Sequence, residues 1–496
     1  MSPSPFPRLQ RRFFPMALII SIILFVLLQM LSARILPLTQ EEGISIQIAM
    51  LLERGHQPYN EIFTFLQPLF LWLLEGIYQP HISPYQHRDL IIIFGLMSLV
   101  STILIARLVA GSLAAAAAGF LFITTTTILT EATNLIAMGP ALSLGLLSVL
   151  TLLYFCKQQR SAWLACSAAL WTTALFLSTA VFAMGLTHLV FLALLAGNAE
   201  GQLQRRVNLT NLTRPYLIWI MVTFIIAGIF LFLSSPIYFS YLIPQQQTLW
   251  ASLPINQVEN FSIIGNFIAL NVVLAGFTLV GLVYLQGHGN HPLWAIILWG
   301  LLNFGWLMIQ NTLQASDVII LVPPMCVIAG WGAIQIGGQA NGWLNRLRNP
   351  ARWKIGSTLL FVIVYLVIVW QQVARYQIQS VRNADDIVQI NERPQVINFI
   401  GQHTQTDHCV ITDDTTLAIE AGRAAHPNLV DLSEARVTSG LLTESDIMTH
   451  IENTPCTLVL FSKRTYYLHL RDVRSWASQH FEQEQRFTKT RIYYGE

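Results

Sequence analysis

The chain has 496 residues, of which 54% are hydrophobic and only 11% are charged, and its mean hydropathy is +0.53. Because a soluble globular domain carries roughly 25% charged residues, this composition indicates an integral membrane protein. The formal net charge is only +2 and the basic residues are scattered along the chain, so the sequence does not predict a nucleic-acid partner.

Charge is distributed unevenly along the chain. Before residue 373 there are 16 Lys and Arg and 10 Asp and Glu, against totals of 28 and 26. The last quarter therefore has the composition of an ordinary soluble domain. We divide the chain into a membrane domain, residues 1–372, with a long outer loop at residues 36–88, and a soluble domain, residues 373–496.

Apolar segments near the roughly 20 residues that cross a bilayer recur through the membrane domain. They predict a polytopic α-helical membrane protein with about eleven transmembrane helices, the first interpreted as an uncleaved anchor. A shorter apolar segment at 63–78, opened by Pro68, predicts an interfacial or re-entrant helix. The predicted spans cover residues 13–35, 89–109, 111–130, 136–155, 162–179, 180–197, 215–235, 262–285, 293–311, 317–337 and 355–372.

The basic residues predict the orientation. With the N-terminus in the cytoplasm, only Arg34, Arg54 and Arg88 of the membrane domain's Lys and Arg residues lie outside, in agreement with the positive-inside rule. An odd number of spans then places the C-terminal domain outside the cytoplasm, for a multi-pass protein of the plasma (inner) membrane. In the same orientation, all acidic residues of the membrane domain except Glu200 fall at the outer ends of the predicted spans or in the outer loops. This one-sided distribution indicates a site on the outer face.

The outer loop begins with a helix signal. Thr39 is followed by Glu41 and Glu42 and then by apolar residues at helical spacing, until Gly55 provides a stop. The pattern predicts an amphipathic helix at the membrane interface. Thr39 and Glu42 suit a capping box, which is a purely structural explanation. The functional alternative is a carboxylate that accepts a proton from an acceptor hydroxyl or amine during attack on an activated sugar.

The order of segments carries a resemblance. One transmembrane helix precedes adjacent acids, the stretch Leu-Leu-Glu-Arg-Gly-His-Gln-Pro-Tyr-Asn-Glu-Ile-Phe at 51–63, an apolar helix with a proline, Pro323-Pro324 in a late span, and an α/β tail. This order resembles the glycosyltransferase C superfamily, especially the family 39-like branch of aminoarabinose transferases and protein O-mannosyltransferases. The resemblance implies an inverting membrane glycosyltransferase in which Glu41 is the catalytic base and Glu42 its companion.

The resemblance also implies partners. The donor would be a polyprenyl-phosphate sugar in the membrane lipid, and the acceptor a glycan, a lipid or a protein. The resemblance does not imply a particular cofactor, although a divalent metal is compatible with the superfamily. Three positions depart from the family pattern: the acids are Glu-Glu rather than Asp-Glu, Gln67-Pro68 replaces Pro-Pro, and a common lysine is replaced near Ser178 and Thr179. The last departure removes an obvious cation for the donor phosphate.

Four further residues are candidates for substrate binding. Arg54 and Arg88 are the loop cations placed to meet an anionic donor head group, although Arg54 suits a pair with neighbouring glutamates equally well. Glu131 ends a predicted outer helix, where an acid is costly unless it is functional or solvated. Arg423, in the soluble domain, is a candidate for facing the donor phosphate. Asp317 is interpreted as an acid that begins a helix.

The soluble domain alternates between predicted helices and strands. Strands at 409–412, 428–432 and 456–461, with a final pair near residues 487 and 492, predict a small parallel or mixed sheet. No glycine-rich phosphate loop follows any strand, so a nucleotide site is not predicted. Cys409 and Cys456 open two of these strands, and a bond between them is one possibility if the domain lies outside.

Two functional hypotheses follow from these observations. The first is the membrane glycosyltransferase described above. The alternative is a non-catalytic protein, either a transporter or flippase for lipid-linked saccharides or a scaffold in envelope glycan assembly. Transporters commonly show internal repeats and charged groups at mid-membrane, and the sequence shows neither, which favours the enzyme. No Cys and His spacing typical of a metal site occurs, so no metal ligands are assigned.

Overall fold

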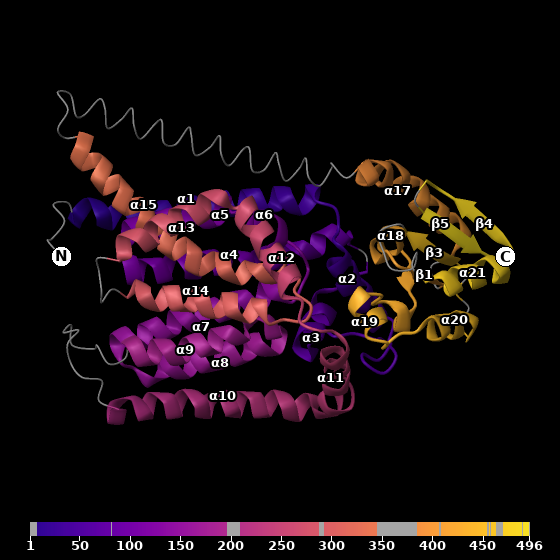
Figure 1. Ribbon diagram of the computed structural model, residues 1–496, viewed down its shortest axis with the longest axis horizontal. Coiled ribbons are helices and arrows are strands. Elements are labelled where there is room, and N and C mark those ends of the chain that lie inside the picture. Colours follow the sequence, from indigo (N-terminus) through magenta and orange to yellow (C-terminus); the bar gives the residue numbers. More distant parts are fainter. Residues whose placement is uncertain are drawn as a thin grey trace.

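The structure is a computed structural model of the chain. It is elongated, with a bundle of helices at the end that holds the N-terminus and a small domain containing a sheet at the other end (Figure 1). The structure describes residues 7–80, 82–195, 209–286, 292–344, 384–405, 408–453, 456, 458–462, 470–488 and 490–495.

Apolar helices form the bundle, because a helix satisfies its own backbone groups where water is absent. Among the described residues, five helical segments are long and apolar enough to cross a membrane, or six if one bent pair counts as a span. The five segments involve α1 (Pro7–Ile35), α4 (Arg88–Ala110), α7 (Met138–Gln158), α10 (Leu209–Ile237) and α15 (Val322–Leu344). The shorter bundle helices are α5 (Ser112–Thr124), α6 (Thr126–Glu131), α8 (Ser161–Leu177), α9 (Phe182–Leu195) and α14 (Leu293–Met308).

The protein is therefore a multi-pass helical membrane protein, but this criterion does not confirm the predicted count of about eleven spans. The predicted span at 355–372 lies outside the described residues. The predicted boundary between two spans at Thr179 is confirmed, since the short turn η2 (Thr179–Val181) separates α8 from α9. The predicted span at 111–130 is interrupted, because α5 ends and α6 begins on either side of Thr125.

The prediction of one continuous span at 262–285 is wrong. The helices α12 (Gln257–Leu270) and α13 (Val272–Leu285) meet at 93°. Asn271 stabilises the break, because its Oδ1 accepts the backbone N–H of Thr126 at 2.8 Å. The Asn271 side chain, at the break between α12 and α13, thus satisfies a backbone N–H at the interruption between α5 and α6. Hydropathy does not register such a break.

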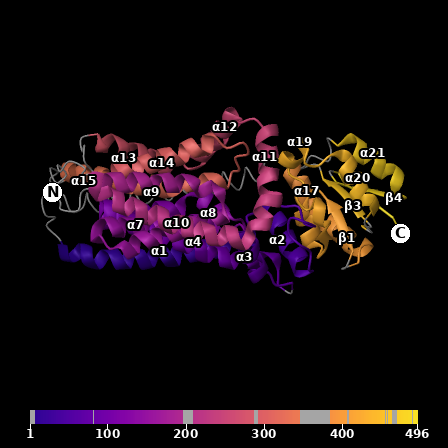
Figure 2. The same cartoon turned by 90° about the horizontal axis from the view of Figure 1, so that it is seen from below.

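The outer loop forms α2 (Gln40–Glu53), α3 (Pro68–Ile77) and the short turn η1 (Pro84–His87). Both predicted helices of this loop are present: α2 has nearly the predicted bounds, whereas α3 begins at Pro68, five residues after the start of the predicted segment 63–78. The predicted water-facing side of α2 is wrong, since even its polar residues Ser45 and Gln47 are buried. The helix lies between the bundle and the C-terminal domain, and α11 (Ile243–Ser252) runs across the same end of the bundle (Figure 2). Tertiary packing, which α2's own pattern does not reveal, covers that side.

The C-terminal domain contains one mixed five-stranded sheet with strand order β2-β1-β3-β5-β4. Strands β2, β1 and β3 are parallel, whereas β5 and β4 are antiparallel to their neighbours. This confirms the predicted small α/β domain. Its elements are α17 (Ala384–His403), β1 (Cys409–Thr412), α18 (Thr415–Glu420), β2 (Ala424–Ala425), η6 (Pro427–Leu429), α19 (Glu434–Thr438), α20 (Glu444–Asn453), β3 (Leu458–Ser462), α21 (Arg471–His480), β4 (Gln483–Arg486) and β5 (Thr490–Tyr494).

For this domain, one predicted strand is wrong, and a disulfide that the sequence left open is present. The predicted strand at 428–432 is wrong, because strand β2 lies earlier and the chain then turns at Pro427, which has no N–H for a sheet ladder. The bond between Cys409 and Cys456 is present, with the two Cα atoms 4.8 Å apart. It links the start of β1 to the segment that enters β3.

Candidate active site

The two glutamates that the sequence singles out begin α2. Thr39 precedes the helix with an extended backbone, and its hydroxyl accepts the N–H of Glu42 at 3.3 Å. The Glu42 carboxylate in turn accepts the N–H of Thr39 at 3.4 Å. The predicted capping box is thus confirmed, and it satisfies two backbone donors at the helix start. Since successive helical residues point roughly 100° apart, the side chains of Glu41 and Glu42 enter different surroundings.

Glu42 forms a bidentate ion pair with Arg88, and both side chains are fully buried. The Arg88 Nε and Nη2 atoms donate to the two carboxylate oxygens at 2.7 and 2.6 Å. Its remaining N–H groups donate to the backbone carbonyls of Ala33, Leu36 and Pro37 at 2.8, 2.8 and 3.0 Å. All five donors of the guanidinium are engaged in this way. Arg88 therefore presents no N–H to a donor phosphate, and it joins α1, α2 and α4 instead.

Glu41 occupies a different environment. It is partly exposed, and its Oε2 accepts a hydrogen bond from the Ser316 hydroxyl at 3.1 Å. Burial raises the pKa of Glu41 above its ordinary value, and the bond from Ser316 opposes that rise. A carboxylate with a raised pKa binds a proton more tightly and is a stronger base. Nothing in the sequence signals Ser316, which lies 275 residues further along the chain.

Glu131, at the end of α6, faces the same region. Burial, and next the charge of Glu41, raise the pKa of Glu131 to about 7, while hydrogen bonds from Thr130 and Asn134 oppose the rise. The Asn134 amide donates to Glu131 Oε2 at 2.9 Å. The structure thus brings two of the predicted site residues, Glu41 and Glu131, close enough for their charges to interact.

Asp317 follows Ser316 directly, and so it borders the same region. It begins the turn η5 (Asp317–Leu321), and its Oδ2 accepts the backbone N–H of Gln314 at 3.2 Å. The prediction that Asp317 begins a helical segment is therefore confirmed. Its charge also interacts with that of Glu41, a proximity that the sequence does not reveal.

Arg54 and Arg423 lie apart from these acids. Arg54 caps the opposite end of α2 and is exposed. Arg423 is buried inside the C-terminal domain, where its guanidinium donates to the Thr404 hydroxyl at 2.8 Å and to the Thr404 and Gly401 carbonyls at 2.7 and 3.1 Å. These contacts hold α17 against the segment before β2, so the geometry gives the Arg423 side chain a structural role.

Carboxylate oxygens are the ligands that hard divalent cations prefer. Within the described part of the chain, however, no group of three or more His, Cys, Asp or Glu side chains gathers closely enough to hold a metal ion. The divalent metal that the family resemblance allows therefore has no prepared ligand set among those residues.

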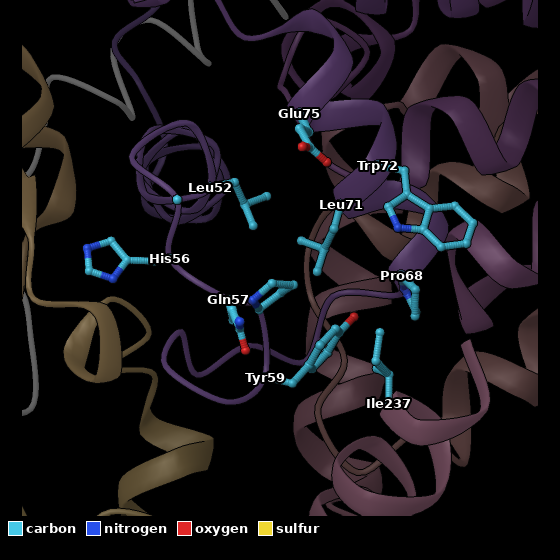
Figure 3. A pocket seen from close by; sticks show the side chains of 11 residues that line it. Leu52, His56, Gln57, Tyr59, Pro68, Leu71, Trp72, Glu75 and Ile237 are labelled. Carbon is cyan, nitrogen blue, oxygen red and sulfur yellow. The ribbon is translucent and has the colours of Figure 1, made fainter. Parts of the chain in front are cut away.

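A pocket of about 280 Å³ lies in the outer loop, between the end of α2, the start of α3 and the end of α10. Trp72 and Glu75 of α3 border it together with Gln57 and Tyr59 of the loop (Figure 3). An aromatic ring beside polar side chains offers both an apolar face and hydrogen-bonding groups to a ligand. None of the residues predicted from the sequence to bind substrate lines this pocket, so it is distinct from the acidic region around Glu41.

The fold, a helical bundle whose outer helix α2 packs against a C-terminal α/β domain, is shared with solved structures of membrane proteins. The structure is similar over nearly its whole length to ArnT from Cupriavidus metallidurans bound to undecaprenyl phosphate, with a TM-score of 0.65, 14% identity, and coverage of 96% of this chain and 97% of that chain. For the apo state of the same protein the TM-score is 0.63 at 13% identity, and 95% of this chain and 97% of that chain are covered.

A second similar structure is the archaeal oligosaccharyltransferase AglB from Archaeoglobus fulgidus, in complex with an inhibitory peptide and a dolichol-phosphate. Here the TM-score is 0.55 and the identity 12%, and the match covers 92% of this chain and 70% of that chain. No protein-family model and no curated protein sequence matches the chain. The resemblance first drawn from the sequence is confirmed at the level of the fold.

Proposed function

We propose that the protein is a membrane glycosyltransferase that moves a sugar from a polyprenyl-phosphate carrier to an acceptor outside the cytoplasm. The observation that carries the proposal is the environment of Glu41. This carboxylate is partly exposed, accepts one hydrogen bond from Ser316, and interacts with Glu131, whose pKa burial and the charge of Glu41 raise to about 7. A carboxylate whose pKa is raised by burial, in a fold shared with proteins solved with polyprenyl phosphates, suits the base of a sugar transfer.

In the proposed reaction Glu41 accepts the proton of an acceptor hydroxyl or amine as that group attacks the anomeric carbon of the sugar. The bond from this carbon to the phosphate oxygen breaks, and the carrier leaves as polyprenyl phosphate. Attack from the face opposite the phosphate inverts the configuration at the sugar carbon. Glu131 would hold a substrate hydroxyl or share the proton with Glu41, while Glu42 would orient the start of α2.

The donor phosphate needs a cation or a set of N–H donors. Of the two loop arginines, Arg88 has all its donors engaged, so we propose that it acts on Glu42. Arg54, the other candidate for the donor head group, caps the far end of α2, about 20 Å from Glu41 along the helix, so it would contact a donor group other than the phosphate at the reacting carbon. Exposed apolar side chains along α10, among them Phe224 and Phe232, would face the lipid in which the carrier is dissolved.

We also propose the topology that the sequence predicts. The protein would lie in the plasma (inner) membrane with about eleven spans, a cytoplasmic N-terminus and an extracytoplasmic C-terminal domain. The bond between Cys409 and Cys456 supports this side for the domain, because disulfides persist in oxidising compartments. A reporter fused near residue 372 that gave a cytoplasmic signal would contradict this orientation.

A transporter of lipid-linked saccharides is the second candidate. The broken helix pair α12–α13, bent by 93°, favours it, because discontinuous helices commonly bind substrates in transporters. At this break, however, the Asn271 amide is already bonded to the hydroxyl of Thr127 and to the backbone N–H of Thr126. These partners suit a structural break better than an ion or substrate site, so we favour the enzyme.

The purified protein, incubated with a panel of radiolabelled polyprenyl-phosphate sugars and with cell-envelope acceptors, tests the proposal. We expect one donor to lose label to an acceptor, and the Glu41→Gln variant to lose this transfer while retaining donor binding. Movement of a labelled lipid between the leaflets of proteoliposomes, with no transfer to any acceptor, would instead support the transporter.

A further inference from the structure

The C-terminal domain contacts the proposed catalytic helix through Gln47, a fully buried residue of α2. Its Nε2 donates to the backbone carbonyl of Arg423 at 2.9 Å, and its Oε1 accepts the backbone N–H of Ala425, also at 2.9 Å. The N–H of Ala425 belongs to β2 and the carbonyl of Arg423 directly precedes it, on the side of this edge strand that does not pair with β1. The side-chain amide has the donor and acceptor of a peptide group. Gln47 therefore completes the sheet edge in place of a neighbouring strand.

Gly43 lies one helical turn before Gln47, on the same face of α2. A Cβ atom at this position would stand 2.7 Å from Thr415 Oγ1 and 2.7 Å from Thr416 Cγ2. Thr416 cannot yield freely, because its hydroxyl donates to Asp414 at 2.5 Å and accepts from Arg393 at 2.8 Å. The absence of a side chain at Gly43 thus permits the first turn of α18 to touch α2.

The opposite side of α2 is held by the membrane domain. Glu42 pairs with Arg88, and Glu41 accepts the hydroxyl of Ser316. A separate contact joins the two domains beside α2, where Tyr85 of η1 donates to Glu420 of α18 at 3.1 Å. The helix that carries the acids is therefore fixed from two sides, by the bundle and by the sheet edge of the C-terminal domain.

We propose that the C-terminal domain sets the position of the Glu41 carboxylate, with Gln47 and Gly43 as positioning residues. The inference rests on the proposed function, in which Glu41 is the base. Because α2 is a short continuous helix, a displacement at Gly43 or Gln47 moves Glu41 relative to Ser316 and Glu131. A shift of about 1 Å at a reacting group costs roughly 100-fold in rate. The domain would thus act on the chemical step as well as on any acceptor that it meets.

The test uses full-length Gln47→Leu and Gly43→Ala variants in the transfer assay. Gln47→Leu removes both hydrogen bonds to the sheet edge, and Gly43→Ala pushes α18 away. We expect kcat to fall roughly 10- to 100-fold with little change in the KM for the lipid donor. We also expect the pH profile of the variants to differ from that of the wild type, because moving Glu41 changes its bond with Ser316 and its charge interaction with Glu131.

The matched control is Ile447→Ala. Ile447 is fully buried in the core of the C-terminal domain, among side chains that do not include α2. This variant destabilises the domain but leaves the contact with α2, so its folded fraction should retain the wild-type kcat and pH profile. A loss of kcat equal to that of Gln47→Leu at matched stability would overturn the positioning role.

Hydrogen exchange of the α2 amides in the full chain provides a readout without catalysis. Faster exchange across α2 in both Gln47→Leu and Gly43→Ala, but not in Ile447→Ala, supports the inference. Unchanged exchange together with unchanged kcat overturns it. If the wild-type chain binds undecaprenyl phosphate but transfers no sugar from any donor, the proposed function fails. This outcome is distinguishable from failure of the positioning role, because it is seen in the wild-type protein before any variant is compared.

Discussion

Glu41 and Glu42 are adjacent in the chain, yet they lie in two regions of opposite character. The Glu42 carboxylate is fully buried and accepts hydrogen bonds from Arg88, from the Thr39 backbone and from the Leu135 backbone. The Glu41 carboxylate is partly exposed and accepts one side-chain bond, from Ser316. The difference shows that partners, not residue type, separate a structural acid from a candidate catalytic acid.

The two regions also differ in how they handle charge. Around Glu42 a guanidinium compensates the buried carboxylate, as a buried charge requires. Around Glu41 the charge of the carboxylate interacts with two further acids, Glu131 and Asp317. A cluster of acids beside a fully compensated ion pair is typical of a functional site. Four predictions test this contrast, beginning with the largest expected effect.

The Glu41→Gln variant should lose sugar transfer by roughly 100- to 10,000-fold, the contribution typical of a general base. The amide keeps the shape of the side chain but cannot take up the proton. The thermal unfolding midpoint in detergent should change little, because only the hydrogen bond from Ser316 is affected. Glu53→Gln, at the far and exposed end of the same helix, is the control and should retain transfer. Full activity of Glu41→Gln would remove Glu41 from the mechanism.

The Arg88→Met variant should lose about 3–5 kcal/mol of stability, because removing one partner leaves the Glu42 charge buried and unpaired. The unfolding midpoint in denaturant or on heating measures this loss. The double variant Arg88→Met with Glu42→Leu removes both charges and should recover part of it. If Arg88→Met were as stable as the wild type, the buried ion pair would not have the structural role described here.

The Glu131→Gln variant should change the pH dependence more than the maximal rate. Activity that depends on ionised Glu41 should rise with pH, and removing the negative charge of Glu131 should move that rise to lower pH. The stability profile should change as well. Burial raises the pKa of Glu131 from 4.5 to about 7, so its contribution to stability is present at low pH and is lost as pH rises from 4.5 to 7. A wild-type stability curve that does not fall relative to Glu131→Gln across this window would contradict the shift.

The Thr39→Ala variant should show the smallest effect, a loss of about 1 kcal/mol, because it removes the hydroxyl that caps α2. Arg88 continues to hold Glu42, so transfer should fall only a few-fold. Thr443→Ala, which removes a similar bond between a hydroxyl and the backbone N–H of Asp446 in the C-terminal domain, is the matched control. A loss of transfer as large as that of Glu41→Gln would mean that the cap, and not the base, dominates the site.

Much of the architecture follows from local signals in the sequence. Runs of apolar residues place most bundle helices, and the capping box places the start of α2 at Gln40. The alternation of strands and helices in the last quarter predicts the α/β domain. These features depend on hydropathy, helix capping and periodicity, which act over a few residues and are therefore legible in a single sequence.

The sequence failed where long-range contacts override local pattern. The break at Asn271 depends on the backbone of Thr126, and the burial of α2 depends on β2, more than 370 residues away in the bond from Ala425 to Gln47. Hydropathy predicts a continuous span in the first case and an exposed helix face in the second.

For the candidate site, the sequence by itself determined that two acids begin the first outer helix, that one of them caps it, and that Glu131 ends an outer helix. Only the tertiary structure decided that Arg88 pairs with Glu42, that Ser316 donates to Glu41, and that the charges of Glu41 and Glu131 interact. The physical reason is that a pKa and a pairing depend on burial and on charges a few ångströms away in space. Residues hundreds of positions apart supply those surroundings, so adjacent glutamates that look alike in the sequence acquire different chemistry in the fold.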